Sequence, residues 1–161
     1  TPDPHDLQTL KNEYRALGGN YTVLHHTTFL ASLVHQGRLA LKLSGERRRL
    51  SYHDPCYLAR YNGEVDAPRD LLRMLGLEVS EMERSGLRSR CCGGGGGAAL
   101  TDIPGKQRIP DIRIEDARNA GAEVVAVACP QCTAMLEGVV GDRPEILDIA
   151  ELVAEALGDR P

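Results

Sequence analysis

The sequence contains no tryptophan and one phenylalanine, and aromatic residues make up only 4% of its 161 residues. A core must therefore be built from leucine, valine, isoleucine and alanine, and there is no aromatic platform on which bases could stack. The chain also lacks an excess of positive charge, since its formal net charge is −4. Nucleic acid is accordingly not expected as a partner.

Long hydrophobic runs are absent as well. No apolar run approaches the roughly 18 residues that a membrane-spanning helix needs, and the N-terminal TPDPHDLQTL lacks the basic and apolar regions of a signal peptide. An apolar share of 42% and a charged share of 26% are typical of an ordinary globular chain with a real core. We expect a cytoplasmic protein without a membrane segment in this chain, in which membrane association would come through other parts of the full protein or through partner subunits.

What the sequence does have is an unusual set of cysteines. Their number is five, so they cannot all pair as disulfides, and reduced thiols are available for metal or redox chemistry. Cys91 and Cys92 are adjacent and are followed by five glycines, residues 93–97, while Cys129 and Cys132 form a Cys-x-x-Cys pair. A flexible linker is the default interpretation of a glycine run, but it does not explain the two thiols that precede it.

Helix and strand patterns alternate along the chain. Apolar spacing and the capping residues predict helices over residues 7–17, 27–37, 66–77, 110–122 and 129–140, and strands over residues 21–26, 48–56, 78–83 and 123–129. A last short strand and helix are expected within residues 144–158. Such alternation is typical of an α/β fold with a parallel sheet, here of about four strands flanked by helices on both faces.

In a parallel sheet the loops that follow the strands meet at one edge, so distant cysteines can share a site there. Cys56 ends one expected strand, and Cys129 ends another. Gathered thiolates favour a soft metal or an iron–sulfur cluster. Glycines beside them, Gly93, Gly94 and Gly95, would let backbone N–H groups approach the sulfurs closely. His53 is placed to support the ligands, and an ordinary structural role fits it equally well.

The ends of the chain also resemble each other. DPHDLQTL (residues 3–10) aligns with CPQCTAML (129–136), and VLHHTTFLASLV (23–34) aligns with ILDIAELVAEAL (146–157). We therefore predict that residues 1–45 are the tail of an upstream, degenerate repeat with its linker, and that residues 46–161 form the cysteine-rich domain. Chance similarity between amphipathic helices is the alternative.

Three motifs together resemble a known family: HDPCYLARYN (53–62), CCGGGGG (91–97) and CPQC (129–132). They are similar to the cysteine-rich CCG domain of iron–sulfur oxidoreductases. That family includes the B and D subunits of heterodisulfide reductase, the iron–sulfur subunits of glycolate and lactate oxidation, and reductases that take electrons from electron-transferring flavoprotein. The likeness is strong from about residue 49 to residue 136.

The resemblance implies that the five cysteines hold a [4Fe–4S]-type cluster, cubane or non-cubane. It also implies an electron-transfer role within a larger enzyme, between a flavoprotein or hydroxyacid dehydrogenase and a quinone or disulfide acceptor. The partners would be other domains or subunits of that redox complex. Where a second copy of the repeat would carry its own Cys-x-x-Cys, this chain has Asp3 and Asp6, and carboxylates are poor ligands for iron–sulfur clusters.

Two other interpretations of the thiols stay open. Four of the five thiolates could form a tetrahedral structural zinc site in a scaffold module without a redox role. Cys129-Pro-Gln-Cys132 after a buried strand also resembles a thioredoxin-like dithiol, although only 29 residues follow it, too few for the rest of that fold.

Overall fold

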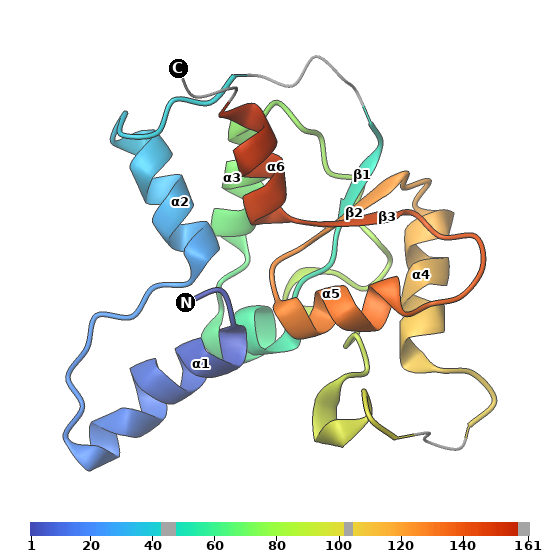
Figure 1. Cartoon of the computed structure of the whole chain (residues 1–161), viewed down its shortest axis with the longest axis horizontal. Coiled ribbons are helices and arrows are strands. Elements are labelled where there is room, and N and C mark those ends of the chain that lie inside the picture. Colours follow the sequence, from blue (N-terminus) through green and yellow to red (C-terminus); the bar gives the residue numbers. More distant parts are fainter. Residues whose placement is uncertain (43–47, 102–104, 158–161) are drawn as a thin grey trace.

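The computed structural model describes residues 1–42, 48–101 and 105–157, and a parallel sheet with helices on both faces lies at its centre (Figure 1). The strands are β1 (Leu50–Tyr52), β2 (Val124–Val127) and β3 (Glu145–Asp148), in the order β1-β2-β3. Leu50 lies opposite Val124, and Val125 lies opposite Ile146. The predicted α/β fold with a parallel sheet is therefore confirmed.

The expected fourth strand, residues 78–83, is reduced to a single parallel bridge between Val79 and Leu50. The Ser80 N–H donates to the Leu50 carbonyl at 2.7 Å, but the Ser80 carbonyl accepts from the Ser51 hydroxyl at 2.6 Å. Because a side chain takes this carbonyl, the backbone ladder does not continue. The sheet thus has three strands and one bridged edge within the described residues.

Helices cover the sheet on both faces because successive side chains of a strand point to opposite sides. On one face, Leu50 and Val124 pack with α2 (His26–His35), α3 (Asp66–Met74) and α6 (Ile149–Ala156). On the other face, Val125 and Val127 pack with α4 (Ile109–Asn119) and α5 (Pro130–Glu137). The helices α3 and α4 belong to the connection from β1 to β2, and α5 connects β2 to β3 (Figure 1).

The N-terminal helical run begins earlier than expected. It comprises α1 (Pro4–Gln8), a π-helical turn η1 (Thr9–Glu13) and a 3-10 turn η2 (Tyr14–Leu17), and it extends away from the sheet (Figure 1). Asp3 caps α1, since its carboxylate accepts from the His5 N–H at 2.7 Å. Asp3 and the proline that follows therefore fix the helix start, where hydrophobic spacing pointed to residue 7.

The strand predicted over residues 21–26 is wrong, since residues 19–25 form neither helix nor strand. The strand-like backbone pairing of this segment in the described chain is with one residue, Thr1: its amino group donates to the Leu24 carbonyl at 3.0 Å, and its carbonyl accepts from the His26 N–H at 3.0 Å. One residue exchanging two bonds follows the parallel pattern but is too short to form a ladder.

The similarity between the two ends of the chain has a structural counterpart. α1 and α5 each begin with a proline, at the aligned positions 4 and 130, and α2 and α6 begin at the aligned positions 26 and 149. The residues before α2 and α6, His25 and Asp148, have φ −70° with ψ 150° and 146°. These matched starts support the repeat, which stays a prediction. The proposed boundary after residue 45 lies outside the described residues.

Three short turns complete the described chain. They are the π-helical turn η3 (Tyr57–Tyr61), which the sequence analysis did not predict, and the 3-10 turns η4 (Gly86–Arg88) and η5 (Gly95–Gly97). A search of the described ranges for a helix long and apolar enough to span a bilayer finds none.

Candidate metal centre

All five cysteines lie beyond the carboxyl end of the sheet, as predicted. Cys56 precedes η3 in the loop after β1, Cys129 lies between β2 and α5, and Cys132 is in the first turn of α5. Cys91 and Cys92 come from the loop between α3 and α4. None forms a disulfide. Cys92, Cys129 and Cys132 are buried, whereas Cys56 and Cys91 are partly exposed.

Side-chain interactions that shift the pKa values of the thiols connect the five cysteines into one chain, in the order Cys56, Cys91, Cys92, Cys132 and Cys129. Cys92, Cys129 and Cys132 also pack together with the Met135 side chain. Residues more than 70 positions apart in the sequence therefore contribute neighbouring sulfur atoms to one site.

The pKa values of the thiols differ along this chain. The Cys56 and Cys92 thiols donate to the Cys91 sulfur and, with the Gly93 N–H, hold the pKa of Cys91 well below its ordinary value. The Cys132 thiol donates to Cys129 and, with the backbone N–H groups at the start of α5, lowers the pKa of Cys129 to about 7. As the donor in this pair, Cys132 has its pKa raised well above its ordinary value. The site thus favours thiolate, the form that binds metal, at two of its positions.

Two of the three predicted glycines face these sulfurs. The Gly93 N–H donates to Cys91 Sγ at 3.3 Å, and the Gly94 N–H donates to the Cys92 sulfur. Gly93 has φ +88°, and a Cβ built on it would lie 2.9 Å from the Ile109 Cβ. A Cβ on Gly94 would lie 2.9 Å from the Gln131 side chain, which donates to the Gly94 carbonyl at 2.6 Å. Gly95 begins η5 and has open space around its Cβ position.

His53 is fully buried, and one of its ring nitrogens lies within 4.8 Å of both Cys92 Sγ and Cys132 Sγ. Its Nδ1 accepts from Arg113 Nε at 2.9 Å. Burial, followed by the charge of Arg113, lowers the pKa of His53 to about 3, so the ring is neutral. Because Nδ1 accepts a hydrogen bond, the ring proton is on Nε2.

Arg113 also belongs to a network of hydrogen bonds and ion pairs in the loops that carry the cysteines. It is 1% exposed, and its guanidinium donates to Asp116 at 3.2 Å and to the Arg84 carbonyl at 2.9 Å. Asp116 also accepts from Arg90 Nε at 2.8 Å. The network therefore ties α4 to the residue that precedes the Cys91-Cys92 pair.

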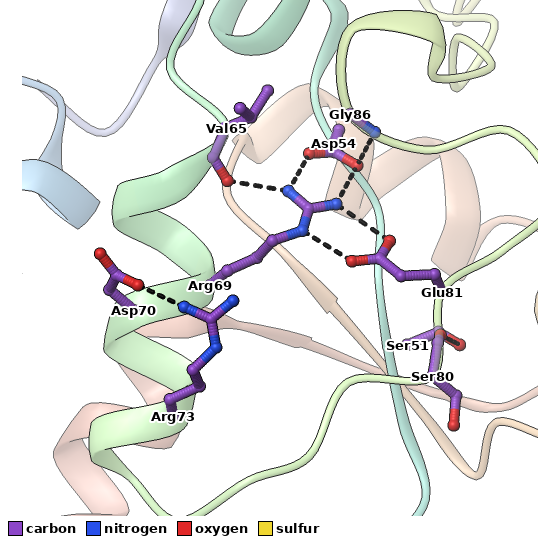
Figure 2. A network of polar contacts seen from close by, with 9 residues as sticks. All are labelled: Ser51, Asp54, Val65, Arg69, Asp70, Arg73, Ser80, Glu81 and Gly86. Carbon is purple, nitrogen blue, oxygen red and sulfur yellow. Dashed lines mark hydrogen bonds and ion pairs between the residues drawn. The ribbon is translucent and has the colours of Figure 1, made fainter.

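A guanidinium clamp fixes the other cysteine loop (Figure 2). Arg69 of α3 donates to both oxygens of Asp54, at 2.7 and 2.9 Å, and to both oxygens of Glu81, at 2.7 and 3.0 Å. Asp54 lies two residues before Cys56, and its carboxylate also accepts from the Gly86 N–H at 2.8 Å. Arg69 thus holds the Cys56 loop against the segment that leads to Cys91, with the paired charges satisfying one another.

Four buried donor groups on β1, on α4 and in the segments that lead to Cys56 and Cys91 have no hydrogen-bond partner within the described chain. They are Tyr52 Oη, His53 Nε2, Ser89 Oγ and Arg113 Nη2. Buried polar atoms are almost always paired in native proteins, so these atoms call for an explanation. Electron-rich sulfur atoms of a bound centre would provide acceptors here.

A smaller set of ligand-type side chains lies on the N-terminal side of the site. One oxygen of Asp3, a ring nitrogen of His5 and Cys129 Sγ lie within 4.8 Å of one another. Asp3 Oδ1 is already bonded to His5 Nδ1 at 2.8 Å and to the His5 N–H. Asp3, which stands in place of a cysteine in the alignment of the two chain ends, therefore caps a helix beside the thiols.

The sequence analysis missed the supporting arginines. Arg113 could have been found, because it lies in the buried stripe of α4 that Pro110, Ile114 and Ala117 define, where a charge needs a buried partner. No sequence pattern of this kind identifies Arg69. Arg69 and Arg73 both lie beside the apolar face of α3, and the sequence does not tell which of them is paired with a buried carboxylate and which is exposed.

The glycine loop provides the first test. Gly93→Ala should lower the free energy of unfolding by roughly 1–3 kcal/mol, because it adds a clash and forces an L residue to positive φ. Gly95→Ala, the matched control, should change it by less than about 0.5 kcal/mol. Chemical denaturation under anaerobic, reducing conditions measures both. Equal effects of the two substitutions would contradict the role of Gly93.

The guanidinium clamp provides the second test. Arg69→Gln leaves Asp54, which is 1% exposed, as a buried charge without its partner, and should cost roughly 3–5 kcal/mol. Arg73→Gln removes an exposed arginine of the same helix that pairs with Asp70 (Figure 2), and should cost less than about 1 kcal/mol. If Asp54→Asn in the Arg69→Gln background recovers no stability, the loss does not come from the unpaired carboxylate.

Comparison with known proteins agrees with the motifs. The family model of the CCG cysteine-rich domain matches residues 50–137. The chain is 58% identical to a probable membrane-anchored ferredoxin of Chromohalobacter salexigens, with 100% of this chain aligned to 25% of that protein. It is 38% identical to the EtfAB:quinone oxidoreductase of Syntrophomonas wolfei, over 96% of this chain and 23% of the relative.

A third relative is a component of the dihydromethanophenazine:CoB–CoM heterodisulfide reductase of Methanosarcina barkeri, 39% identical over 86% of this chain and 34% of the relative. The chain therefore spans between 23% and 34% of the length of these proteins. The resemblance drawn from the three motifs is confirmed: the chain belongs to the family of cysteine-rich CCG domains found in iron–sulfur oxidoreductases.

Proposed function

We propose that Cys56, Cys91, Cys92, Cys129 and Cys132 hold a [4Fe–4S]-type cluster, and that the domain passes electrons within a larger oxidoreductase. The observation that carries the proposal is the continuous chain of five sulfurs at one edge of the sheet, with no disulfide among them. A bound cluster would supply one-electron redox chemistry at this edge. The protein supplies thiolates, buried donors and exclusion of water.

The surrounding donors fit such a group. Gly93 and Gly94 direct N–H groups at ligand sulfurs, and the unpaired Nε2 donor of His53 belongs to a buried ring with one nitrogen within 4.8 Å of the Cys92 and Cys132 sulfurs. Hydrogen bonds to the sulfurs stabilise the more negative, reduced state and so raise the reduction potential. Gly95 makes no such contact in the described chain, so the proposed glycine contacts with the cofactor are limited to Gly93 and Gly94.

His53 acts here as a donor and not as a metal ligand. A metal at Nε2 would displace the ring proton to Nδ1, where it would face the Arg113 Nε–H across 2.9 Å. With Arg113 donating to Nδ1, the Nε2 proton remains available to the neighbouring sulfurs of Cys92 and Cys132. Arg113 is thus a positioning residue, which fixes the protonated face of the ring.

A structural zinc site is the alternative. Zinc in a closed site takes four ligands and leaves one thiol of the five unused. All five sulfurs here belong to one connected group, and His53, a nearby candidate ligand, has its Nε2 protonated. A non-cubane cluster with five cysteine ligands would therefore use the whole thiol set, whereas zinc, like a cubane cluster, would leave one thiol unused.

We base the proposed electron donor and acceptor on the names of the relatives. One relative is named as an EtfAB:quinone oxidoreductase and another as part of a heterodisulfide reductase. Between these types we favour transfer from a flavoprotein to a quinone, with a hydroxyacid dehydrogenase and a disulfide as the other donor and acceptor. A relative named as membrane-anchored supports membrane association through parts outside this chain.

Metal analysis tests the centre itself. Protein purified or reconstituted anaerobically should contain iron and acid-labile sulfide in about equal amounts, absorb near 400 nm and give an electron paramagnetic resonance signal in one redox state. Cys91→Ser and Cys92→Ser should lose iron and absorbance while far-ultraviolet circular dichroism keeps the helical signal. A colourless protein with one zinc and no redox wave would refute the electron-transfer function.

Redox titration tests the proposed role of His53. His53→Ala removes an N–H···S donor worth about 1 kcal/mol, so the midpoint potential should fall by roughly 40 mV. Arg113→Lys, which removes the Nε–H donor that orients the ring, should shift it in the same direction. His25→Gln is the matched control, because His25 is equally buried but contacts Thr27 and Pro2 instead. An unchanged potential in His53→Ala with full iron content would rule out the donor role.

A further inference from the structure

Two of the five cysteines reach the protein surface. Cys92, Cys129 and Cys132 are buried, while Cys56 and Cys91 are partly exposed. Cys56 is followed directly by η3, and Cys91 by the glycine loop. A protein that exchanges electrons with this site would therefore come nearest to it over the surface formed around Cys56.

Three arginines surround this surface. Arg60 in η3 contacts the Cys56 sulfur through its side chain, and Arg84 and Arg88 come from the segment that leads to Cys91. Together with Glu83 and Leu87 they line a hollow of about 360 Å³, here called the arginine hollow. It is formed by residues of η3, of η4 and of the segment just before η4, and η3 and η4 pack against each other.

The guanidinium groups of the arginine hollow have no carboxylate within 4.0 Å in the described part of the chain. By contrast, the neighbouring Arg69, Arg90 and Arg113 all pair with Asp or Glu. Three positive charges thus face one negative charge, Glu83, on a chain whose formal net charge is −4. The charge of this surface is opposite to that of the whole chain, which indicates an anionic occupant.

The occupant is better matched by a protein surface than by a small anion. All five lining side chains are exposed, and Leu87 is 61% exposed at the centre of the run from Arg84 to Arg88. An apolar contact within a charged rim is the usual anatomy of a protein interface. Electron-transfer encounters use small interfaces of this kind, with complementary charge that raises the association rate.

We infer that the arginine hollow is the docking surface for an acidic electron-transfer protein, which exchanges electrons with the centre past Cys56. The inference rests on the proposed electron-transfer function. Arg60, Arg84 and Arg88 guide the partner by charge, and Leu87 supplies the apolar contact. The partner's electron crosses at one of the two partly exposed ligands, so docking here gives a short approach.

Two protein probes of opposite charge test the surface. Reduced flavodoxin, an acidic carrier, gives one electron to the oxidised centre, and the reduced centre gives one electron to basic cytochrome c. Stopped-flow spectroscopy follows both rates at low and high ionic strength. The variant Arg60→Gln, Arg84→Gln, Arg88→Gln should slow the flavodoxin reaction about tenfold at low salt, flatten its dependence on salt and leave the cytochrome c reaction equal or faster.

The matched control removes the same number of arginines elsewhere. Arg49 and Arg143 precede β1 and β3, at the opposite edge of the sheet from the cysteines, and Arg38 follows α2. The variant Arg38→Gln, Arg49→Gln, Arg143→Gln should react with flavodoxin within about twofold of the wild type. Leu87→Ala should weaken the flavodoxin complex without changing the salt dependence.

A binding measurement does not depend on electron transfer. Calorimetry with oxidised flavodoxin at low salt should show a complex that the hollow variant loses and the control variant keeps. Equal losses in both variants would overturn the docking surface while the centre still loads and reacts. If the hollow variant still reacts with flavodoxin but no longer binds hexacyanocobaltate, a redox-inert trianion, the arginine hollow is a small-anion site and not a docking surface. A centre that fails to load iron at all would refute the proposed function instead.

Discussion

The parallel pairing of β1 with β2 is the constraint on which the rest of the structure depends. It directs the chain after Tyr52 and after Val127 to the same edge of the sheet, so that Cys56 and Cys129 leave neighbouring strands side by side. The crossover between these strands returns over both faces and brings Cys91 and Cys92 to that edge. Val124 packs in the core on one face of the sheet and Val125 and Val127 in the core on the other, so a one-residue slip would move each side chain into the wrong core.

Two buried arginine networks then hold the cysteine loops without using the sulfurs. Arg69 joins Asp54 to Glu81, and Arg113 joins His53 to Asp116. Each network joins a loop that carries a cysteine to a helix that covers the sheet, so the thiols are positioned by contacts in which the sulfurs take no part. Such preorganisation lowers the entropic cost of bringing ligands together.

Much of this arrangement could be predicted from the sequence, because strand ends, helix starts and cysteine spacing are local patterns. The alternation that placed Cys56 and Cys129 after strands is confirmed for β1 and β2. Prediction failed where pairing decides: residues 21–26 have strand propensity, but in the described chain their strand-like backbone pairing is with the single residue Thr1, and Val79 makes one bridge because Ser51 bonds the next carbonyl. Arg69 could not be predicted for the same reason, since Asp54 and Glu81, its partners, lie on other elements.

The distribution of charge around the site follows from these contacts. Arg113, which is buried, and Arg90, which is partly exposed, share one carboxylate, Asp116, so this network has more positive than negative charge. Farther out, Arg60, Arg84 and Arg88 extend the same sign to the surface. This edge is therefore positive on a chain whose formal net charge is −4. Under the proposed function, a negative cofactor at the buried end and an acidic partner at the exposed end would both be attracted to it.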